Sequence, residues 1–137
     1  MLGVTLYSLP PRTDTRGTLY ALEGGDPLPF PLARLFLIKD CPTDAVRANH
    51  AVTAHQALVA VTGGVTADLD NGVERQTLRL DDASRVLHLS PGVWLRLREF
   101  SDDTTVLVTS SQRFADVVYF DAPQPHLLEE LLPKAGQ

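Results

Sequence analysis

The sequence predicts an all-β protein whose strands form a sandwich or a closed barrel. Short apolar runs recur from residue 4 to residue 120, and the clearest are residues 35–38, 57–61, 65–69, 77–80, 86–89, 93–97 and 106–109. The runs are separated by residue pairs that favour tight turns, namely Gly63-Gly64, Asn71-Gly72, Asp81-Asp82 and Asp102-Asp103. No long helical period lies between them. This spacing favours a sandwich or barrel, because closing a sheet removes its exposed edges.

Two elements are predicted in more detail. Residues 65–75 predict a β-hairpin in which Asn71-Gly72 supplies the two central residues of a type I′ turn. Residues 125–132 predict the one helix of the chain, because leucines at positions 127, 128, 131 and 132 form one apolar stripe that Pro133 ends. We expect this stripe to dock on the barrel or on a partner subunit.

Composition narrows the class of protein. A chain of 137 residues fits one domain, which we place at residues 1–137. The net charge of -5 argues against a nucleic-acid-binding surface, which would need clustered Lys and Arg. The single cysteine, Cys41, excludes an internal disulfide and disfavours a thiolate metal site. Without a secretory signal or an apolar run of about 18 residues, we expect a cytoplasmic protein that does not enter the membrane.

The densest polar segment beside a predicted strand is residues 47–56, RANHAVTAHQ. It resembles the first motif of the metal-binding cupins, which reads His, any residue, His, three or four residues, Glu, and then Gly after a short strand. The matching positions here hold His50, Val52, Gln56 and Gly63. A second cupin motif contains Pro, Gly and, a few residues later, a histidine, at which position this chain has Leu95. The resemblance implies a cupin fold, that is, a double-stranded β-helix or jelly-roll barrel, here with a short C-terminal helix.

These replacements predict a barrel that holds no metal. Val52 and Leu95 replace two of three imidazoles and Gln56 replaces the carboxylate, so one good donor remains where a stable site needs three or four. His55 lies at an odd offset from His50, and in a regular strand it would face the opposite side of the sheet. A bulge between the two histidines would leave that question open.

Residues 5–128 as a whole resemble the thymidine-diphosphate-linked 4-keto-6-deoxy sugar 3,4-ketoisomerases. Residues 14–19, DTRGTL, are similar to the family's Asp-x-Arg-Gly-x-Leu, and residues 29–36, PFPLARLF, to its Pro-Phe-x-x-x-Arg-Val-aromatic strand. Residues 47–56 are similar to its Arg-Gly-x-His-Ala-His segment with the following Gln, and residues 70–72 to its Asp-Asp-Gly turn. Residues 93–101, VWLRLREFS, and 106–110, VLVTS, are similar to its last two blocks. The order and spacing of these motifs carry the resemblance.

The resemblance implies a homodimeric, metal-free isomerase that needs no cofactor and moves a ketone between C4 and C3 of a dTDP-sugar. Such a shift passes through an enediol and needs a base at C3, a proton donor at C4 and donors to the developing oxyanion. The family's two histidines and its nearby tyrosine map to His50, Val52 and Leu37, so that only His50 matches. His55 is a possible substitute acid/base.

Arginines and one tryptophan are the candidates for binding the nucleotide. Guanidinium groups bind phosphate oxygens through two hydrogen bonds, and an indole stacks on a base or sugar. The predicted substrate-binding residues are Arg16, Arg34, Arg47, Gln56, Trp94 and Arg96. Two rivals stay open: a cupin that has lost the chemistry and serves as a sugar-nucleotide sensor or partner subunit, and an epimerase or dehydratase that uses one histidine.

Overall fold

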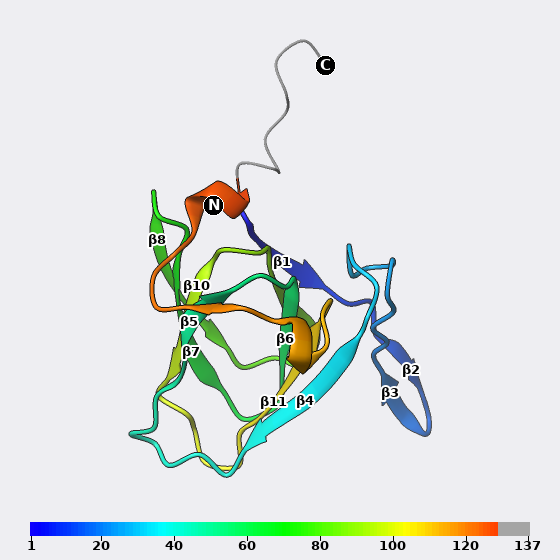
Figure 1. The fold of residues 1–137 in the computed structure, drawn as a ribbon. Coiled ribbons are helices and arrows are strands. Elements are labelled where there is room, and N and C mark those ends of the chain that lie inside the picture. The colour runs from blue at the N-terminus through cyan, green and yellow to red at the C-terminus, as the bar shows by residue number, and fades with distance from the viewer. Residues whose placement is uncertain (129–137) are drawn as a thin grey trace.

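The computed structural model describes residues 1–128, and its longer strands form two antiparallel sheets that face each other (Figure 1). The first sheet has five strands, which in spatial order are β1 (Val4–Ser8), β9 (Arg85–Leu89), β6 (Gln56–Thr62), β11 (Thr105–Ser110) and β4 (Arg34–Lys39). The second also has five, in the order β12 (Tyr119–Phe120), β5 (Arg47–Val52), β10 (Trp94–Arg98), β7 (Val65–Asp70) and β8 (Arg75–Leu80).

The strand order is that of a jelly roll, which confirms the predicted fold class. The first sheet contains the sequence β4-β11-β6-β9 and the second contains β5-β10-β7-β8, so successive strands of the chain mostly cross from one sheet to the other. Strand β1 extends the first sheet beyond β9, and β12 extends the second beyond β5. The eight central strands therefore form the barrel, and the two additions widen it.

A small hairpin stands apart from this barrel. Strands β2 (Arg12–Asp14) and β3 (Gly17–Leu19) pair only with each other and project away from the sheets (Figure 1). All six of their residues are exposed. The hairpin is therefore not held by packing against the barrel of its own chain.

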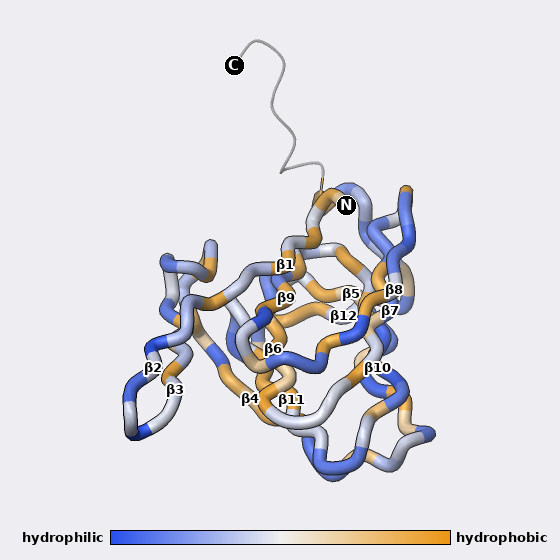
Figure 2. Tube along the Cα trace, turned by 180° about the vertical axis from the view of Figure 1, so that it is seen from behind, coloured by the Kyte–Doolittle hydropathy of each residue, from blue (hydrophilic) through white to orange (hydrophobic). Residues whose placement is uncertain are grey.

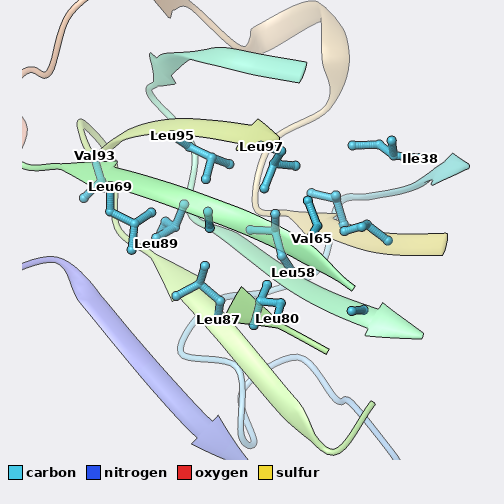
Figure 3. Packing of buried hydrophobic residues seen from close by; sticks show 14 of the residues in the cluster. Ile38, Leu58, Val65, Leu69, Leu80, Leu87, Leu89, Val93, Leu95 and Leu97 are labelled. Atoms are coloured by element: carbon cyan, nitrogen blue, oxygen red, sulfur yellow. The ribbon is translucent and has the colours of Figure 1, made fainter. Parts of the chain in front are cut away.

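The main core fills the space between the two sheets. Strands alternate their side chains, so Val65 and Leu69 of β7 and Leu95 and Leu97 of β10 point inward (Figure 3). Leucines of β6 and β9 meet them from the opposite sheet, as the labelled side chains show. The tube coloured by hydropathy shows apolar segments on the barrel strands and polar ones at the loops (Figure 2).

A second, smaller core lies on the outer face of the first sheet. There Leu9, Leu28 and Phe30 of the N-terminal segment cover Val59 of β6 and Val86 of β9. The connection between β3 and β4 is thus packed on the barrel although it contains no long strand.

The β7–β8 hairpin is present, but the type I′ turn was a wrong prediction. Asp70 pairs with Arg75, so four residues and not two connect the strands. The side chain of Asn71 accepts hydrogen bonds from the backbone N–H groups of Val73 and Glu74, at 2.9 and 2.8 Å. This local capping by an Asn side chain competes with the two-residue turn.

The predicted C-terminal helix begins at the expected residue. Helix α1 (Pro125–Leu128) is the described part of the predicted helix at residues 125–132, and the remainder lies outside the described residues. Leu128 is buried and belongs to the main core. The first part of the stripe thus docks on the barrel of its own chain.

Candidate active site

A cavity of about 220 Å³ opens between the two sheets. Its polar lining residues come from five strands and are Arg34, Arg47, His50, Gln56, Ser110 and Tyr119. The remaining lining residues are Phe36, Ile38, Ala48, Leu58, Leu95, Leu97, Val108 and Val117. The cavity therefore combines an apolar wall with a few hydrogen-bonding groups, as small-molecule sites commonly do.

A bulge in β5 brings its polar residues to this cavity. Leu95 of β10 pairs with His50 and the next residue, Arg96, pairs with Ala48, so that Asn49 is the extra residue. Ala48 and Asn49 both have left-handed backbone conformations, with φ of 63° and 65°. The irregularity lets Arg47, Ala48 and His50 line the same cavity, whereas a regular strand would turn neighbouring side chains to opposite faces.

His50 has the properties of a neutral general base. Partial burial is the main cause that lowers the pKa of the imidazole, and it outweighs the opposing influence of the residue's own backbone. The side chain is therefore uncharged at neutral pH and free to accept a proton. Its Nδ1 atom is buried and has no hydrogen-bond partner among the described residues. No carboxylate is among the residues that line the described cavity.

Two guanidinium groups give the cavity a positive wall. The guanidinium carbon of Arg34 lies 4.4 Å from the ring centre of Phe36 and 5.0 Å from that of Phe114, which belongs to the short 3₁₀ helix η1 (Phe114–Asp116). Stacking between two rings fixes the plane of the guanidinium. Arg47 lines the same cavity from β5. An anionic ligand group would be attracted to this wall.

Tyr119 lines the cavity and was not predicted from the sequence. Strand β12 pairs with β5 so that Tyr119 lies opposite Val52, on the same inner face as His50. The rings of Tyr119 and His50 meet edge to face, with 4.9 Å between their centres and 72° between their planes. The only signal in the sequence is the apolar and aromatic run at residues 117–120, which has no motif around it.

The structure corrects the position assigned to the family's tyrosine. Leu37 is 56% exposed and does not line the cavity, because the inward residues of β4 are Arg34, Phe36 and Ile38. The alternation of the strand thus places Phe36, and not Leu37, beside the cavity. Phe36 has no hydroxyl group, so the strand still lacks the polar group expected there.

Leu95 and Val52 lie as the motifs predicted. Leu95 is 4% exposed, lines the cavity and pairs directly with His50. Val52 is buried at an even offset from His50 on the same strand. Both positions therefore face inward, but with apolar side chains.

Trp94 and Arg96 lie on the outer face of the second sheet and do not reach the cavity. They alternate with the inward Leu95 and Leu97, and this odd offset decides their direction. Arg96 donates a hydrogen bond to the buried carboxylate of Asp68 at 2.9 Å. Its guanidinium carbon lies 5.5 Å from the centre of the Trp94 ring.

An ion pair with Asp68 holds Arg96 on the outer face of the second sheet. Arg98 also donates to Asp68, at 2.6 Å, and this contact holds the pKa of the carboxyl well below its ordinary range. Burial of Asp68 opposes the shift, while Thr77 and Arg96 add to it. Arg96 thus belongs to a charge network that stabilises the outer face.

Arg16 is likewise separated from the cavity of its own chain. It sits at the turn of the exposed β2–β3 hairpin, where it donates hydrogen bonds to the carboxylate of Asp14. This contact raises the pKa of Arg16 and lowers that of Asp14. Both side chains are largely exposed, so the pair contributes little to stability.

His55 lies in a separate cluster on the outer face of the first sheet. Its Nδ1 atom is 3.1 Å from Nε2 of His88, and the two rings are stacked at 5.3 Å between centres. Phe30 stacks on both rings and Tyr7 lies against His88. The structure therefore does not place His55 where it could replace a second histidine beside His50.

Among the described residues, no three side chains of His, Cys, Asp or Glu gather in a set that could hold a metal ion. No helix within residues 1–128 has the length and apolar character needed to cross a membrane.

A jelly-roll barrel with one histidine and two arginines around an interior cavity defines the class of cupin-type small-molecule proteins. Within that class the chain belongs to the family described as FdtA, WxcM-like, C-terminal, whose model matches residues 2–127. It is 32% identical over 127 residues to the TDP-4-oxo-6-deoxy-alpha-D-glucose-3,4-oxoisomerase of Aneurinibacillus thermoaerophilus, covering 90% of this chain and 91% of the relative.

Solved structures agree with this assignment. The 3,4-ketoisomerase QdtA from Thermoanaerobacterium thermosaccharolyticum, in complex with TDP, superposes with a TM-score of 0.80 at 26% identity and 93% coverage of both chains. The TDP-quinovose 3,4-ketoisomerase WlaRB from Campylobacter jejuni gives a TM-score of 0.85 at 24% identity, over 94% of this chain and 99% of the other, and shows the same fold. The resemblance to the sugar 3,4-ketoisomerases is thus confirmed.

Proposed function

We propose that this chain is an isomerase that moves the ketone of a dTDP-4-keto-6-deoxyhexose between C4 and C3. The observation that carries the proposal is His50, neutral and half-buried in an interior cavity, in a chain related over nine-tenths of its length to a 3,4-oxoisomerase. The rearrangement oxidises C3 and reduces C4 of the same sugar, so it needs no external oxidant or reductant. We propose that residues 1–137 act as one domain without a metal or cofactor.

The role of His50 follows from the chemistry of the shift. A ketone at C4 acidifies the C3 proton, and its removal gives an enediolate that is reprotonated at C4 to leave the ketone at C3. A neutral imidazole can take the first proton and return it in the second step. Positive groups near the cavity stabilise the negative charge that develops on the sugar oxygen.

Arg34 and Arg47 are the proposed contacts of the anionic part of the substrate. Both line the cavity, and Arg34 is held in place between Phe36 and Phe114. The planar guanidinium suits two hydrogen bonds to phosphate oxygens. Gln56, the first residue of β6, lines the same cavity as His50 and is the proposed neutral hydrogen-bonding group for the sugar.

A homodimer is the proposed assembly. Several large apolar side chains remain exposed on the outer face of the first sheet and on the segment that precedes it, at Leu19, Tyr20, Leu32, Leu35, Leu37 and Val61. Four of them, Tyr20, Leu32, Leu35 and Val61, line an apolar hollow of about 410 Å³. Contiguous exposed apolar surface of this kind favours an interface between proteins.

A second copy would also account for the projecting hairpin. The β2–β3 hairpin carries Arg16 away from its own cavity and packs on no strand of its own barrel. Isolated two-stranded hairpins are marginally stable in water. We propose that the hairpin meets the partner subunit, where Arg16 becomes available to substrate. The presence of Cys41 as a free thiol is consistent with the reducing cytoplasm that we propose as its compartment.

Hydrogen exchange at C3 tests the proposed reaction. We expect the protein, incubated with dTDP-4-keto-6-deoxyglucose in deuterated water, to exchange the C3 proton and form the 3-keto sugar, as followed by NMR. His50→Asn should lower both rates by about 10²–10⁴-fold, the range for loss of a general base. His126→Asn, which changes an exposed histidine of α1, is the matched control and should leave both rates unchanged.

Two results would overturn the isomerase assignment in different ways. Binding of dTDP without C3 exchange would support the rival in which the cupin is a sugar-nucleotide sensor or partner subunit. Absence of both exchange and dTDP binding would show that the nucleotide itself is the wrong ligand. Exchange followed by inversion at C3, without movement of the ketone, would indicate an epimerase.

A further inference from the structure

Tyr119 is the cavity residue whose chemistry the proposed function leaves unused. The centres of the Tyr119 and His50 rings are 4.9 Å apart. Among the residues that line the described cavity, Tyr119 alone carries a phenol group. Strand β12 fixes it opposite Val52, the position where the related enzymes' motif has a second histidine. The phenol thus lies beside the position where a polar partner of His50 has been replaced by an apolar side chain.

We propose that Tyr119 is the second proton-transfer group of this site and acts on the sugar oxygens while His50 acts on the carbons. This inference rests on the proposed isomerase function. Two groups are needed because the reaction moves two protons: one passes from C3 to C4, and the other passes from O3 to O4. One imidazole cannot hold both protons at once.

The steps balance without any other reactant. The C3–H bond breaks, its electron pair forms the C3–C4 double bond, and His50 takes the proton while Tyr119 donates its phenolic proton to O4. The resulting phenolate then takes the proton from O3, and C3 becomes the ketone. The electron pair of the double bond finally takes the proton of the His50 imidazolium at C4, which restores both side chains.

The surroundings of His50 favour this division of roles. Once protonated, His50 is a partly buried cation whose Nδ1 has no hydrogen-bond partner among the described residues, and no carboxylate lines the described cavity to stabilise it. A phenolate formed in the same step would belong to a ring whose centre lies 4.9 Å from the centre of the imidazolium. The pair then carries no net charge, which reduces the cost of forming a buried ion.

Tyr119→Phe tests the inference. We expect kcat for ketone migration to fall by about 10²–10⁴-fold, as for loss of one acid/base group, while KM for the sugar nucleotide changes by less than about threefold. Exchange of the C3 proton with solvent should fall less than product formation, because His50 remains. Tyr7→Phe removes a phenol on the outer face of the first sheet and is the matched control, with both rates unchanged.

If Tyr119→Phe folds poorly, the pH dependence of kcat in a chain with 3-fluorotyrosine at position 119 tests the same role. In a chain whose Tyr7 and Tyr20 are replaced by Phe, 3-fluorotyrosine at position 119 should keep the activity and move the basic limb of the kcat–pH profile to lower pH, because fluorine makes a phenol more acidic. An unchanged profile, or a Tyr119→Phe enzyme as fast as the parent, would overturn the role of Tyr119 alone. A parent protein without C3 exchange would overturn the isomerase function and this role with it.

Discussion

Two adjacent histidines, the buried His88 and the half-buried His55, lie where they cannot easily be charged. His88 is 5% exposed on β9 of the first sheet, and burial together with the nearby His55 lowers its pKa to about 4. The rings of Tyr7 and Phe30 face the two imidazoles, Ser111 hydrogen-bonds with the backbone of His55, and none of these groups is anionic. Two neutral imidazoles can share one N–H hydrogen bond, but protonation of both would place like charges 3.1 Å apart.

The pair predicts a loss of stability in acid. Because the folded pKa of His88 lies below the ordinary value of 6.5, the unfolded chain binds more protons, and stability that is complete above pH 6.5 declines as the pH falls towards 4. His88 alone accounts for up to about 3 kcal/mol of this decline. His55 and His50, whose pKa values are lowered by burial, act in the same direction.

The free energy of unfolding in urea, measured from pH 7.5 to pH 4.5, checks this prediction. His88→Gln keeps a hydrogen-bonding side chain beside His55 but cannot be charged, and it should flatten the dependence on pH. His126→Gln, at an exposed site, should leave the slope as it is in the parent. Equal slopes in all three proteins would contradict the assignment of the acid sensitivity to His88.

The site was predictable where a motif fixed both the residue and its direction. His50, Arg34 and Gln56 share one cavity because the motifs placed them on inward positions of β4, β5 and β6, whereas Arg47 joins them through the bulge of β5. Arg16, Trp94 and Arg96 have suitable chemistry but lie elsewhere, since side-chain type says nothing about the face of a strand. Tyr119 was not predicted because it lies in a two-residue strand, which is too short to show a periodic pattern.

At the scale of single elements, the bulge of β5 is the feature that builds the cavity wall. Ala48 and Asn49 adopt positive φ, a conformation that costs a residue with a Cβ about 1 kcal/mol and that glycine adopts without strain. The related isomerases' motif has glycine at the position of Ala48. The backbone of β5 is therefore strained at a position where the family pattern has none.

This strain predicts that glycine is tolerated at position 48 better than elsewhere in the strand. Ala48→Gly should raise the free energy of unfolding, or lower it only slightly, because relief of the strained φ offsets the greater entropy of glycine in the unfolded chain. Ala51→Gly, three residues along the same strand and fully buried with ordinary backbone angles, should instead lower it by about 1 kcal/mol or more. Chemical denaturation of both variants gives the comparison. Equal destabilisation by the two would show that the bulge stores no strain.

The elements themselves were predicted with differing success for physical reasons. The strands from β4 and from β6 to β11 were predicted because each carries a short apolar run that faces the core. The bulged β5 is rich in polar residues and lacks such a run, and the exposed hairpin β2–β3 has no apolar alternation. In the β7–β8 connection, hydrogen bonds to the side chain of Asn71 replaced the turn that Asn-Gly usually forms.

At the scale of the whole molecule, the outer face of one sheet is polar and that of the other is largely apolar. The outer face of the second sheet carries the Asp68, Arg96 and Arg98 network and is suited to water. The outer face of the first sheet carries Leu35 and Leu37, which are 54% and 56% exposed, beside the apolar hollow that Leu107 helps to line. An apolar outer face is suited to burial against a second subunit, whereas a charged one is suited to water. The first sheet is therefore the interface that we propose for the homodimer.

A charge on that face should therefore separate the subunits. Leu37→Glu would have to bury a carboxylate without a partner in the interface, which costs several kcal/mol and should convert the dimer to monomers at micromolar concentrations. Val73→Glu, at a position that is 86% exposed in the β7–β8 connection, is the matched control and should leave the mass unchanged. Sedimentation equilibrium measures both. A Leu37→Glu protein with the same mass as the parent would show that the first sheet is not the interface, and the projecting Arg16 would then need another partner surface.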